Sequence, residues 1–566
     1  MNTTHTWARR WTGVLALLAA LSIPAQAVSP VPGPPSPPGP TADDQTPPTF
    51  LVTGRAEYLD KAWDASGWTG DLPLLPVRRA DVTVLDAATG KVLGRGQTDQ
   101  SGEYAVAAKS GGLRDLQVRI EASTRHAKLV GAPFARLRIT TPGNAVWALH
   151  TPVVSGHDTT EPIDLGTATA LPVASLNGNQ GNPFNIFDLS VSAFEWLGTS
   201  ELTLPVRGRA TIAWPSLLGS YAWKRKAWVA TDDGDDDAVI LHELGHVVHH
   251  LFSDSDNPGG IHYFGDSDQD PRLSFGEGWA TAFAAAVLGD LGQAPVYLDA
   301  NGAEALGGVQ LQLDLETAHP YASTTHGAAD EVAVACVIYD LLDDRTAPDG
   351  SPFIDDDGFD LGTLVDGLAP RQALWEVFTG PVRRARRLTA NHLWDGWFKR
   401  HGDDPHFDDL LAAHAAWGLL FWNDAAEPDQ DPLDAVPLAP VSSSSGSDAG
   451  WSDVRTLYYT EDPALGTGTG DRDRFSLLLT AGQTLTLETR YPGGAWDART
   501  QVDPALALFG PNGKKIAFDD DTGSGRNARI AGLVVPESGS WTVVVSSRNR
   551  TSRYGCYEIR AMVSAD

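Results

Sequence analysis

The most regular pattern of hydrophobic and polar residues lies in segment 238–251. Its apolar positions recur at intervals of three, four and three residues, the spacing of one face of an α-helix. These positions are Leu241, Leu244, Val248 and Leu251. Three aspartates at 235–237 precede the segment, where carboxylates favour the positive end of the helix dipole. The pattern predicts a helix over this segment, with the aspartates in its first turn and one face turned to a hydrophobic core.

Three further segments carry apolar residues with helical periodicity: 185–197, 273–286 and 331–343. Two short strands are predicted between the first of them and the helix described above: 210–214 and 227–230. Together these elements predict a central, mostly helical α+β domain that covers residues 152–422.

Strict alternation of apolar and polar residues, which is typical of strands, marks the regions on either side of this domain in the sequence. Segment 116–120 is one example in region 49–151, and segment 484–489 is another in region 453–566. Glycine, asparagine and aspartate turns separate the predicted strands. We therefore predict a multidomain protein with an N-terminal β-sandwich and a C-terminal, jelly-roll-like β-sandwich.

The remaining segments are a targeting signal and two linkers. Arg9 and Arg10 precede an apolar run, and a small-residue cleavage site ends at Ala27, so residues 1–27 are predicted to be a signal peptide. Residues 28–48 are rich in proline and residues 423–452 in Asp-Pro pairs and serine, which is typical of linkers. We expect a bacterial protein that is secreted to the extracellular medium without a membrane anchor.

The amino-acid composition limits the classes of binding partner that we expect. The 566 residues include 42 Lys and Arg against 72 Asp and Glu, a formal net charge of −30. Such acidity argues against binding to nucleic acid or to an anionic membrane. The two cysteines, Cys336 and Cys556, fall in different predicted domains, so a disulfide framework is not expected.

The predicted helix at 238–251 carries the sequence His-Glu-Leu-Gly-His. Residues four apart lie on one face of a helix, so His242 and His246 can both reach a single zinc ion. Glu243 lies beside them, where a carboxylate can take a proton from water that zinc has acidified. The motif predicts metal-assisted hydrolysis of an amide bond, with His242 and His246 as metal ligands and Glu243 as general base.

A catalytic zinc ion needs a third protein ligand. Glu277, in the predicted helix at 273–286, is the best candidate, and Asp266 and Asp268 are alternatives. A different interpretation makes Glu277 the twelfth residue of a calcium loop that begins at Asp266, although proline replaces the glycine expected at its sixth position. His249 shares the helix face of His242 and is expected to be a hydrogen-bond partner of the site or a solvent-facing residue.

The His-Glu-Leu-Gly-His sequence and Gly-Glu-Gly-Trp at 276–279 together resemble the gluzincin metallopeptidases, which include the thermolysin-like and fungalysin-like enzymes. The resemblance covers roughly residues 180–420 and implies a zinc peptidase in which Glu277 is the third ligand. Those enzymes place an acid four residues after this glutamate to support a histidine ligand. This chain has Thr281 there, so the supporting residue is not identified.

The same resemblance implies two features of substrate binding. An edge strand pairs with the substrate backbone, and segment 227–230 is a candidate for it, although an ordinary internal strand is equally consistent with the sequence. A tyrosine or histidine donates a hydrogen bond to the oxyanion. The candidates for this donor are Tyr263, His319, Tyr321 and His326.

The flanking β regions resemble other modules. Segment 96–104 resembles a hairpin of the carboxypeptidase-regulatory-like sandwiches, and region 453–566 resembles the bacterial pre-peptidase C-terminal domain, which accompanies secreted proteases. Calcium is a second candidate cofactor because aspartates cluster in two places. The possible calcium ligands are Asp266, Asp268, Asp270, Asp355 and Asp357.

The sequence therefore predicts a secreted zinc-dependent endopeptidase that acts on protein or peptide substrates. The alternative is a non-catalytic secreted surface or adhesion protein built around a degenerate metallopeptidase core. The absence of the supporting acid after Glu277 motivates this alternative. The intact residues His242, Glu243 and His246 argue against it.

Overall fold

The computed structural model describes the chain from Pro48 to Ser564 in segments. These are residues 48–64, 67–124, 136–171, 181–199, 209–253, 255, 257–260, 262–266, 269–293, 296–299, 311–315, 330–342, 370–384, 388–401, 413–414, 417, 419, 435–438, 441–442, 453–457, 472–490, 503–525, 527–547 and 555–564. The predicted signal peptide, nearly all of the proline-rich linker and most of the second linker lie outside them.

The N-terminal region consists of strands. They are β1 (Thr49–Leu59), β2 (Trp63–Asp64), β3 (Gly67–Trp68), β4 (Leu74–Pro76), β5 (Asp81–Asp86), β6 (Lys91–Gln97), β7 (Glu103–Lys109), β8 (Leu113–Glu121), β10 (Ala148–His150), β11 (Val154–Asp158) and β12 (Ile163–Ala170). One sheet has the order β12-β1-β4, with β7 also paired to β1, and the other has the order β10-β8-β5-β6, with β11 also paired to β8. Burial alternates residue by residue along β7, as the period of a strand requires.

The boundary expected between residues 151 and 152 does not coincide with these sheets. β12, which follows it, pairs in parallel with β1, and Val52 lies opposite Ile163. β9 (Arg136–Thr140), which precedes it, pairs instead with a strand of the central region. These pairings cross the expected boundary because they join segments that are far apart in sequence, and local alternation of residues carries no information about them.

The central sheet has the order β14-β15-β13-β9 and consists of β13 (Arg209–Ser216), β14 (Tyr221–Trp223), β15 (Lys226–Ala230) and β9. β13 runs parallel to β15, and β14 runs antiparallel to β15. Among the described residues, β14 is therefore an edge strand and β15 is internal. A further pair is formed by β16 (Val296–Asp299) and β17 (Leu311–Asp314).

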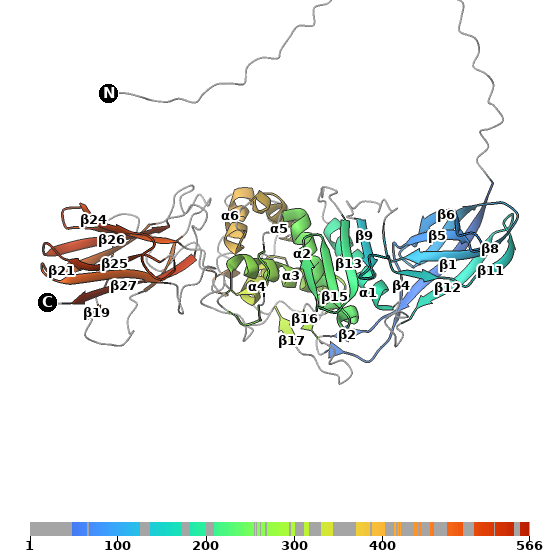
Figure 1. Cartoon of the computed structure of the whole chain (residues 1–566), viewed down its shortest axis with the longest axis horizontal. Helices are drawn as coiled ribbons and strands as arrows, with labels where there is room; N and C mark the ends of the chain where they lie inside the picture. The colour runs from blue at the N-terminus through green and yellow to red at the C-terminus, as the bar shows by residue number, and fades with distance from the viewer. Residues whose placement is uncertain are drawn as a thin grey trace, which may run out of the picture. The chain divides into compact units, whose positions relative to one another are not determined.

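Six helices are described in the central region, together with the 3-10 turns η1 (Asp233–Asp235) and η4 (Val382–Arg384). The helices are α1 (Gly181–Thr199), α2 (Asp237–Ser253), α3 (Pro271–Asp290), α4 (Glu331–Asp340), α5 (Pro370–Thr379) and α6 (Ala390–His401). α2 begins at Asp237, the last of the three aspartates expected in its first turn, and packs against β14 and β15. Figure 1 shows α2 beside β15. α3 packs against both α2 and α4.

Two glycines of the sequence motifs lie where these helices cross. A Cβ atom on Gly245 of α2 would lie 2.9 Å from the Cα atom of Ala280 in α3. A Cβ atom on Gly278 of α3 would lie 2.7 Å from a methyl group of Val334 in α4. Both positions lack room for a side chain, so Gly245 allows the close approach of α2 and α3, and Gly278 allows that of α3 and α4.

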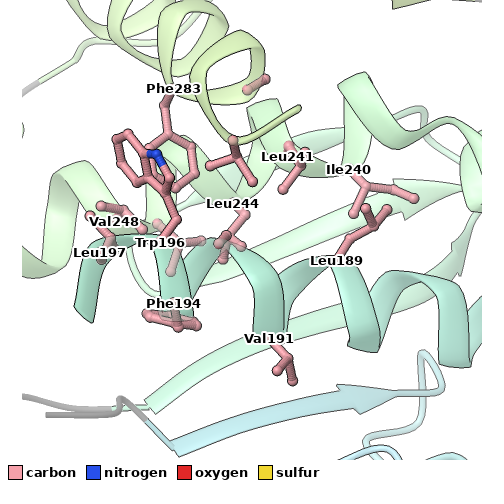
Figure 2. Close-up of a cluster of buried hydrophobic side chains, with 14 of the residues drawn as sticks. Leu189, Val191, Phe194, Trp196, Leu197, Ile240, Leu241, Leu244, Val248 and Phe283 are labelled. Carbon is pink, nitrogen blue, oxygen red and sulfur yellow. The ribbon is translucent and has the colours of Figure 1, made fainter. Parts of the chain in front are cut away.

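A hydrophobic cluster holds α2 against α1 and α3 (Figure 2). α1 contributes large side chains such as Phe194 and Trp196, and α2 contributes Leu244 and Val248 from the face that its periodicity predicted. Trp196 also meets Phe283 of α3 edge to face, with ring centroids 5.5 Å apart. Because these side chains are buried, the opposite face of α2 is fixed in its orientation toward the functional site.

The C-terminal region is again made of strands. They are β18 (Val436–Pro437), β19 (Val441–Ser442), β20 (Asp453–Leu457), β21 (Arg472–Leu479), β22 (Thr484–Arg490), β23 (Pro504–Phe509), β24 (Lys515–Asp519), β25 (Arg529–Val534), β26 (Gly539–Ser547) and β27 (Gly555–Ser564). Their sheets have the orders β18-β21-β26-β23-β24 and β19-β27-β22-β25, with β20 also paired to β27. A separate hydrophobic cluster lies within this region.

The structure thus confirms the coarse fold class, a mixed protein in which β-sheet regions flank a region with helices. Among the described residues, no helix has both the length and the apolar character that a membrane span requires.

Candidate metal centre and active site

Helix α2 places the residues of its motif around one point. The Nε2 atoms of His242 and His246 lie 3.1 Å apart, and the two rings are nearly perpendicular, with an angle of 87°. His242 is buried and His246 is partly exposed. The spacing of four residues therefore directs both imidazole nitrogens to a common centre, as the sequence predicted.

Helix α3 brings Glu277 to the same centre. Its Oε2 atom lies 3.2 Å from Nε2 of His242 and 2.9 Å from Nε2 of His246. The ligand atoms of these three residues all lie within 4.8 Å of one another, so the group could hold a metal ion. Two imidazole nitrogens and one buried carboxylate form a donor set that fits a divalent transition metal. Glu277 therefore lies with the two histidines of the motif.

Two further side chains form hydrogen-bond contacts with His242 and Glu277. The hydroxyl of Thr281 lies 3.1 Å from Nδ1 of His242, and the amide of Asn257 donates a 2.9 Å hydrogen bond to Oε1 of Glu277. Thr281 follows Glu277 by one helical turn, so it faces the same side of α3. The sequence had left the supporting residue unidentified, and that spacing was the signal that could have revealed it. Asn257 lies in the α2–α3 connection and carried no such signal.

The three grouped residues influence one another's protonation. Burial lowers the pKa of His242 to about 4, so its ring is neutral near neutral pH. Burial also disfavours the charged form of His246, but the carboxylates of Glu277 and Glu243 outweigh it and raise the pKa of His246 to about 9. Burial opposes ionisation of Glu277, but the charge of His246 and hydrogen bonds from both histidines hold the pKa of Glu277 well below its ordinary value. The carboxylate of Glu277 thus stabilises a positive charge on His246 at this centre.

Glu243 lies beside this centre without a fixed partner. It is buried, and its Oε2 atom has no hydrogen-bond partner among the described residues. Burial raises the pKa of Glu243 to about 8 in the absence of a metal ion. A carboxylate with such a raised pKa is well placed to accept a proton and release it again near neutral pH.

A cavity of about 1070 Å³ opens over these residues. His242, Glu243, His246 and Glu277 all line it, and the edge strand β14 contributes further residues, among them Trp223. The strand at 227–230, which the sequence offered as a candidate edge, is the internal strand β15. The backbone edge nearest the motif is therefore provided by β14.

Of the four expected oxyanion donors, the described residues include Tyr263 alone. Tyr263 is 69% exposed and does not line the cavity, and His319, Tyr321 and His326 lie outside the described residues. His262, the neighbour of Tyr263, does line the cavity. Its Nε2 atom lies 3.6 Å from Oε2 of Glu277. His262 was not predicted, because it belongs to a connection without periodicity.

Tyr297 of β16 also lines the cavity and was not predicted. Its ring centroid lies 5.5 Å from that of His242, and its side chain is buried. Burial, reinforced by the negative charge of Asp299, raises the pKa of Tyr297 well above its ordinary value. The phenol therefore stays protonated and able to donate a hydrogen bond.

The proposed calcium ligands are placed as follows. Asp270 caps α3, accepts hydrogen bonds from the backbone and side chain of Arg272 and forms an ion pair with it, so its carboxylate is already engaged. Asp266 is exposed. Neither belongs to the groups of metal-ligating side chains found among the described residues. Asp268, Asp355 and Asp357 lie outside the described residues.

His249 differs from both roles expected of it. It is 1% exposed and its ring packs against Phe275 and Phe378, with centroids 5.5 and 5.1 Å away. Neither of its nitrogens has a hydrogen-bond partner among the described residues, and burial lowers the pKa of His249 to about 3. It is therefore a neutral core residue of α2 rather than a partner of the site or a solvent-facing residue.

No protein-family model matches the sequence. No curated protein matches it either. Among solved structures, the periplasmic inhibitor of g-type lysozyme from Aeromonas hydrophila is 18% identical over 23% of this chain and 96% of its own, with a TM-score of 0.15.

Two other solved structures share similarly limited regions. The pre-peptidase C-terminal domain of collagenase from Bacillus anthracis is 11% identical over 19% of this chain and 87% of its own, with a TM-score of 0.14. A 9R-lipoxygenase from Cyanothece PCC8801 is 17% identical over 28% of this chain and 25% of its own, with a TM-score of 0.14. With such TM-scores, these similarities assign neither a family nor an activity to the chain.

Proposed function

We propose that this protein is a secreted zinc-dependent endopeptidase. The observation that carries the proposal is the convergence of His242, His246 and Glu277 on one centre, with the unpartnered carboxylate of Glu243 beside it. Two histidines and one glutamate are the ligands of a known class of catalytic zinc site. Zinc bound there would act as a Lewis acid and make water acidic enough to lose a proton near neutral pH.

The side chains around this centre have distinct roles in the proposed reaction. Glu243 takes the proton from the attacking water and delivers it to the leaving amine, because its carboxylate is free to exchange protons. With a metal ion on Nε2 of His242, the proton of that ring would lie on Nδ1, where the hydroxyl of Thr281 can accept it. Asn257 orients Glu277 through Oε1 and leaves Oε2 directed at the histidines.

The proposed substrate is an extended peptide that lies along β14. An edge strand offers unpaired backbone groups with which a peptide can form main-chain hydrogen bonds. On the rim of the cavity, Leu217 is 86% exposed and Trp223 is 59% exposed. These apolar surfaces favour substrates with a large apolar side chain near the scissile bond.

The secreted location rests on the sequence of residues 1–27 alone, and the β-sandwich and pre-peptidase assignments of the flanking regions remain predictions. The threonine at position 281, which motivated the non-catalytic alternative, is accounted for by its hydrogen bond to His242. The two functions differ in a simple experiment. Purified protein is expected to digest denatured casein, to lose this activity with a chelator and to regain it with zinc, whereas an absence of digestion after metal loading would support the adhesion protein.

A further inference from the structure

His262 and Glu331 lie next to the proposed zinc centre, and the mechanism above uses neither of them. His262 belongs to the connection between α2 and α3, and Glu331 is the first residue of α4. Nε2 of His262 lies 3.6 Å from Oε2 of Glu277 and 3.6 Å from Oε2 of Glu331. Their ligand atoms and that of Glu277 all lie within 4.8 Å of one another.

The separations fit a shared cation better than direct hydrogen bonds. A distance of 3.6 Å exceeds the normal range of an N–H···O hydrogen bond. Two ligands that bind one ion at about 2.0–2.2 Å in tetrahedral geometry are roughly 3.3–3.6 Å apart. Nδ1 of His262 lies 3.1 Å from the carbonyl oxygen of Gly260. If Nδ1 donates its proton to that oxygen, the lone pair of Nε2 faces the two carboxylates.

Glu331 needs a positive partner that the described residues do not fully supply. Its side chain is 2% exposed, and neither carboxylate oxygen has a hydrogen-bond partner among the described residues. The first amides of α4 do not serve it, since those of Val332 and Ala333 are bonded to the cap Asp330. The backbone amide of Glu331 itself is bonded to Gln269. A buried carboxylate left without compensation is costly, so a cation at this position would stabilise it.

The neighbouring charges reinforce this requirement. Glu243, Glu277 and Glu331 are three buried carboxylates that line or adjoin one cavity. A single divalent ion at the first centre balances only two of them when all are ionised. A second divalent ion would compensate the third and separate Glu331 from Glu277.

We propose that His262, Glu277 and Glu331 form a second divalent-cation site, which shares the carboxylate of Glu277 with the centre formed by His242 and His246. The proposal rests on the proposed function only through this shared ligand. One imidazole and two carboxylates suit zinc or another first-row divalent ion. Paired ions in hydrolases stabilise developing charge on both sides of the reacting atom. The second ion would thus supply the electrostatic role that the sequence assigned to a tyrosine or histidine donor.

The test counts zinc ions without relying on activity. The full chain is stripped of metal, dialysed against zinc and analysed for bound zinc per molecule, for wild type and for Glu331→Gln and His262→Gln. His250→Gln is the matched control, because His250 lines the same cavity but belongs to neither ligand group. We expect two ions in wild type and in the control, and one ion in each of the other variants, with the affinity for the second ion reduced at least tenfold.

The other outcomes are distinct. One ion in every protein would overturn the second site and leave the proposed function standing, and so would two ions in both test variants. No ion in wild type would overturn the second site and the proposed function together. If Glu331→Gln fails to fold because its side chain is buried, His262→Gln decides the result, since His262 lies in a loop and is partly exposed.

Discussion

Replacing Thr281 by valine removes a hydroxyl from behind His242 without changing the size of the side chain. The pKa of His242 is lowered to about 4 by burial, so the ring is neutral at pH 7 and carries a single proton. When Nε2 binds a metal ion, that proton must lie on Nδ1, whose neighbour is the Thr281 hydroxyl at 3.1 Å. Valine would leave a buried N–H without an acceptor.

The expected magnitude follows from this geometry. A buried donor without a partner costs about 1–3 kcal/mol, and loss of a residue that supports a metal ligand typically weakens metal binding about 10–100-fold. A 10–100-fold weaker affinity corresponds to about 1.4–2.8 kcal/mol, so the two figures agree. We therefore expect Thr281→Val to raise the zinc dissociation constant about 10–100-fold. Thr281→Ser keeps the hydroxyl and is expected to bind zinc within about threefold of wild type.

Zinc affinity would be measured by competition with a chromogenic chelator at pH 7.5. Melting temperatures with and without zinc would show whether the loss lies in metal binding or in the fold, because a ligand stabilises the folded state by an amount that grows with the logarithm of its concentration relative to its dissociation constant. The reasoning is refuted if Thr281→Val binds zinc as tightly as wild type, or if Thr281→Ser loses as much affinity as Thr281→Val.

Three further predictions follow from the same region. Glu277→Gln is expected to lose tight zinc binding in a metal analysis while keeping its circular dichroism spectrum, because the amide is nearly isosteric but uncharged; full zinc occupancy would contradict it. Gly278→Ala is expected to lower stability in urea unfolding by about 1–3 kcal/mol, because the new methyl group meets Val334 at 2.7 Å; unchanged stability would mean that α3 and α4 can separate at no cost. His249→Phe is expected to reduce the loss of stability in acid. The pKa of His249 is about 3 in the folded protein and 6.5 in the unfolded chain. The stability contributed by the neutral ring is therefore fully present above pH 6.5 and is lost as the pH falls toward 3. The difference between wild type and variant should approach roughly 4 kcal/mol at the acid end, and parallel pH profiles of the two proteins would contradict the assignment.

The helical part of the site follows from local sequence, which explains why it could be predicted. His242 and His246 are fixed on one face of α2 by their spacing, and the apolar residues on the opposite face bury it against α1 and α3. Glu277 was recognisable because its helix carried its own apolar pattern. Thr281 could have been found by the same helical spacing.

The rest of the site depends on contacts that no periodicity records. His262 lies in a connection, and Glu331 lies near Glu277 because α4 packs against α3, with Val334 of α4 against Gly278. The edge position of β14 depends on strand order, and the pairing of β12 with β1 likewise crosses the boundary expected at residue 151. The helix face predicted for His249 was correct, but its predicted role was wrong. Residues on nearly all sides of α2 are buried, so the helix has no exposed surface on which His249 could lie.

The central claim is that this site hydrolyses peptide bonds with Glu243 as the base, and one variant tests it most directly. Glu243→Gln preserves the shape of the side chain and removes its ability to take a proton, and Glu243 is not among the grouped metal ligands. The measurement is zinc content together with the rate of cleavage of a denatured, fluorogenic protein substrate. The account predicts unchanged zinc content and a loss of at least about 100-fold in kcat/KM. Cleavage by Glu243→Gln at the wild-type rate would contradict it.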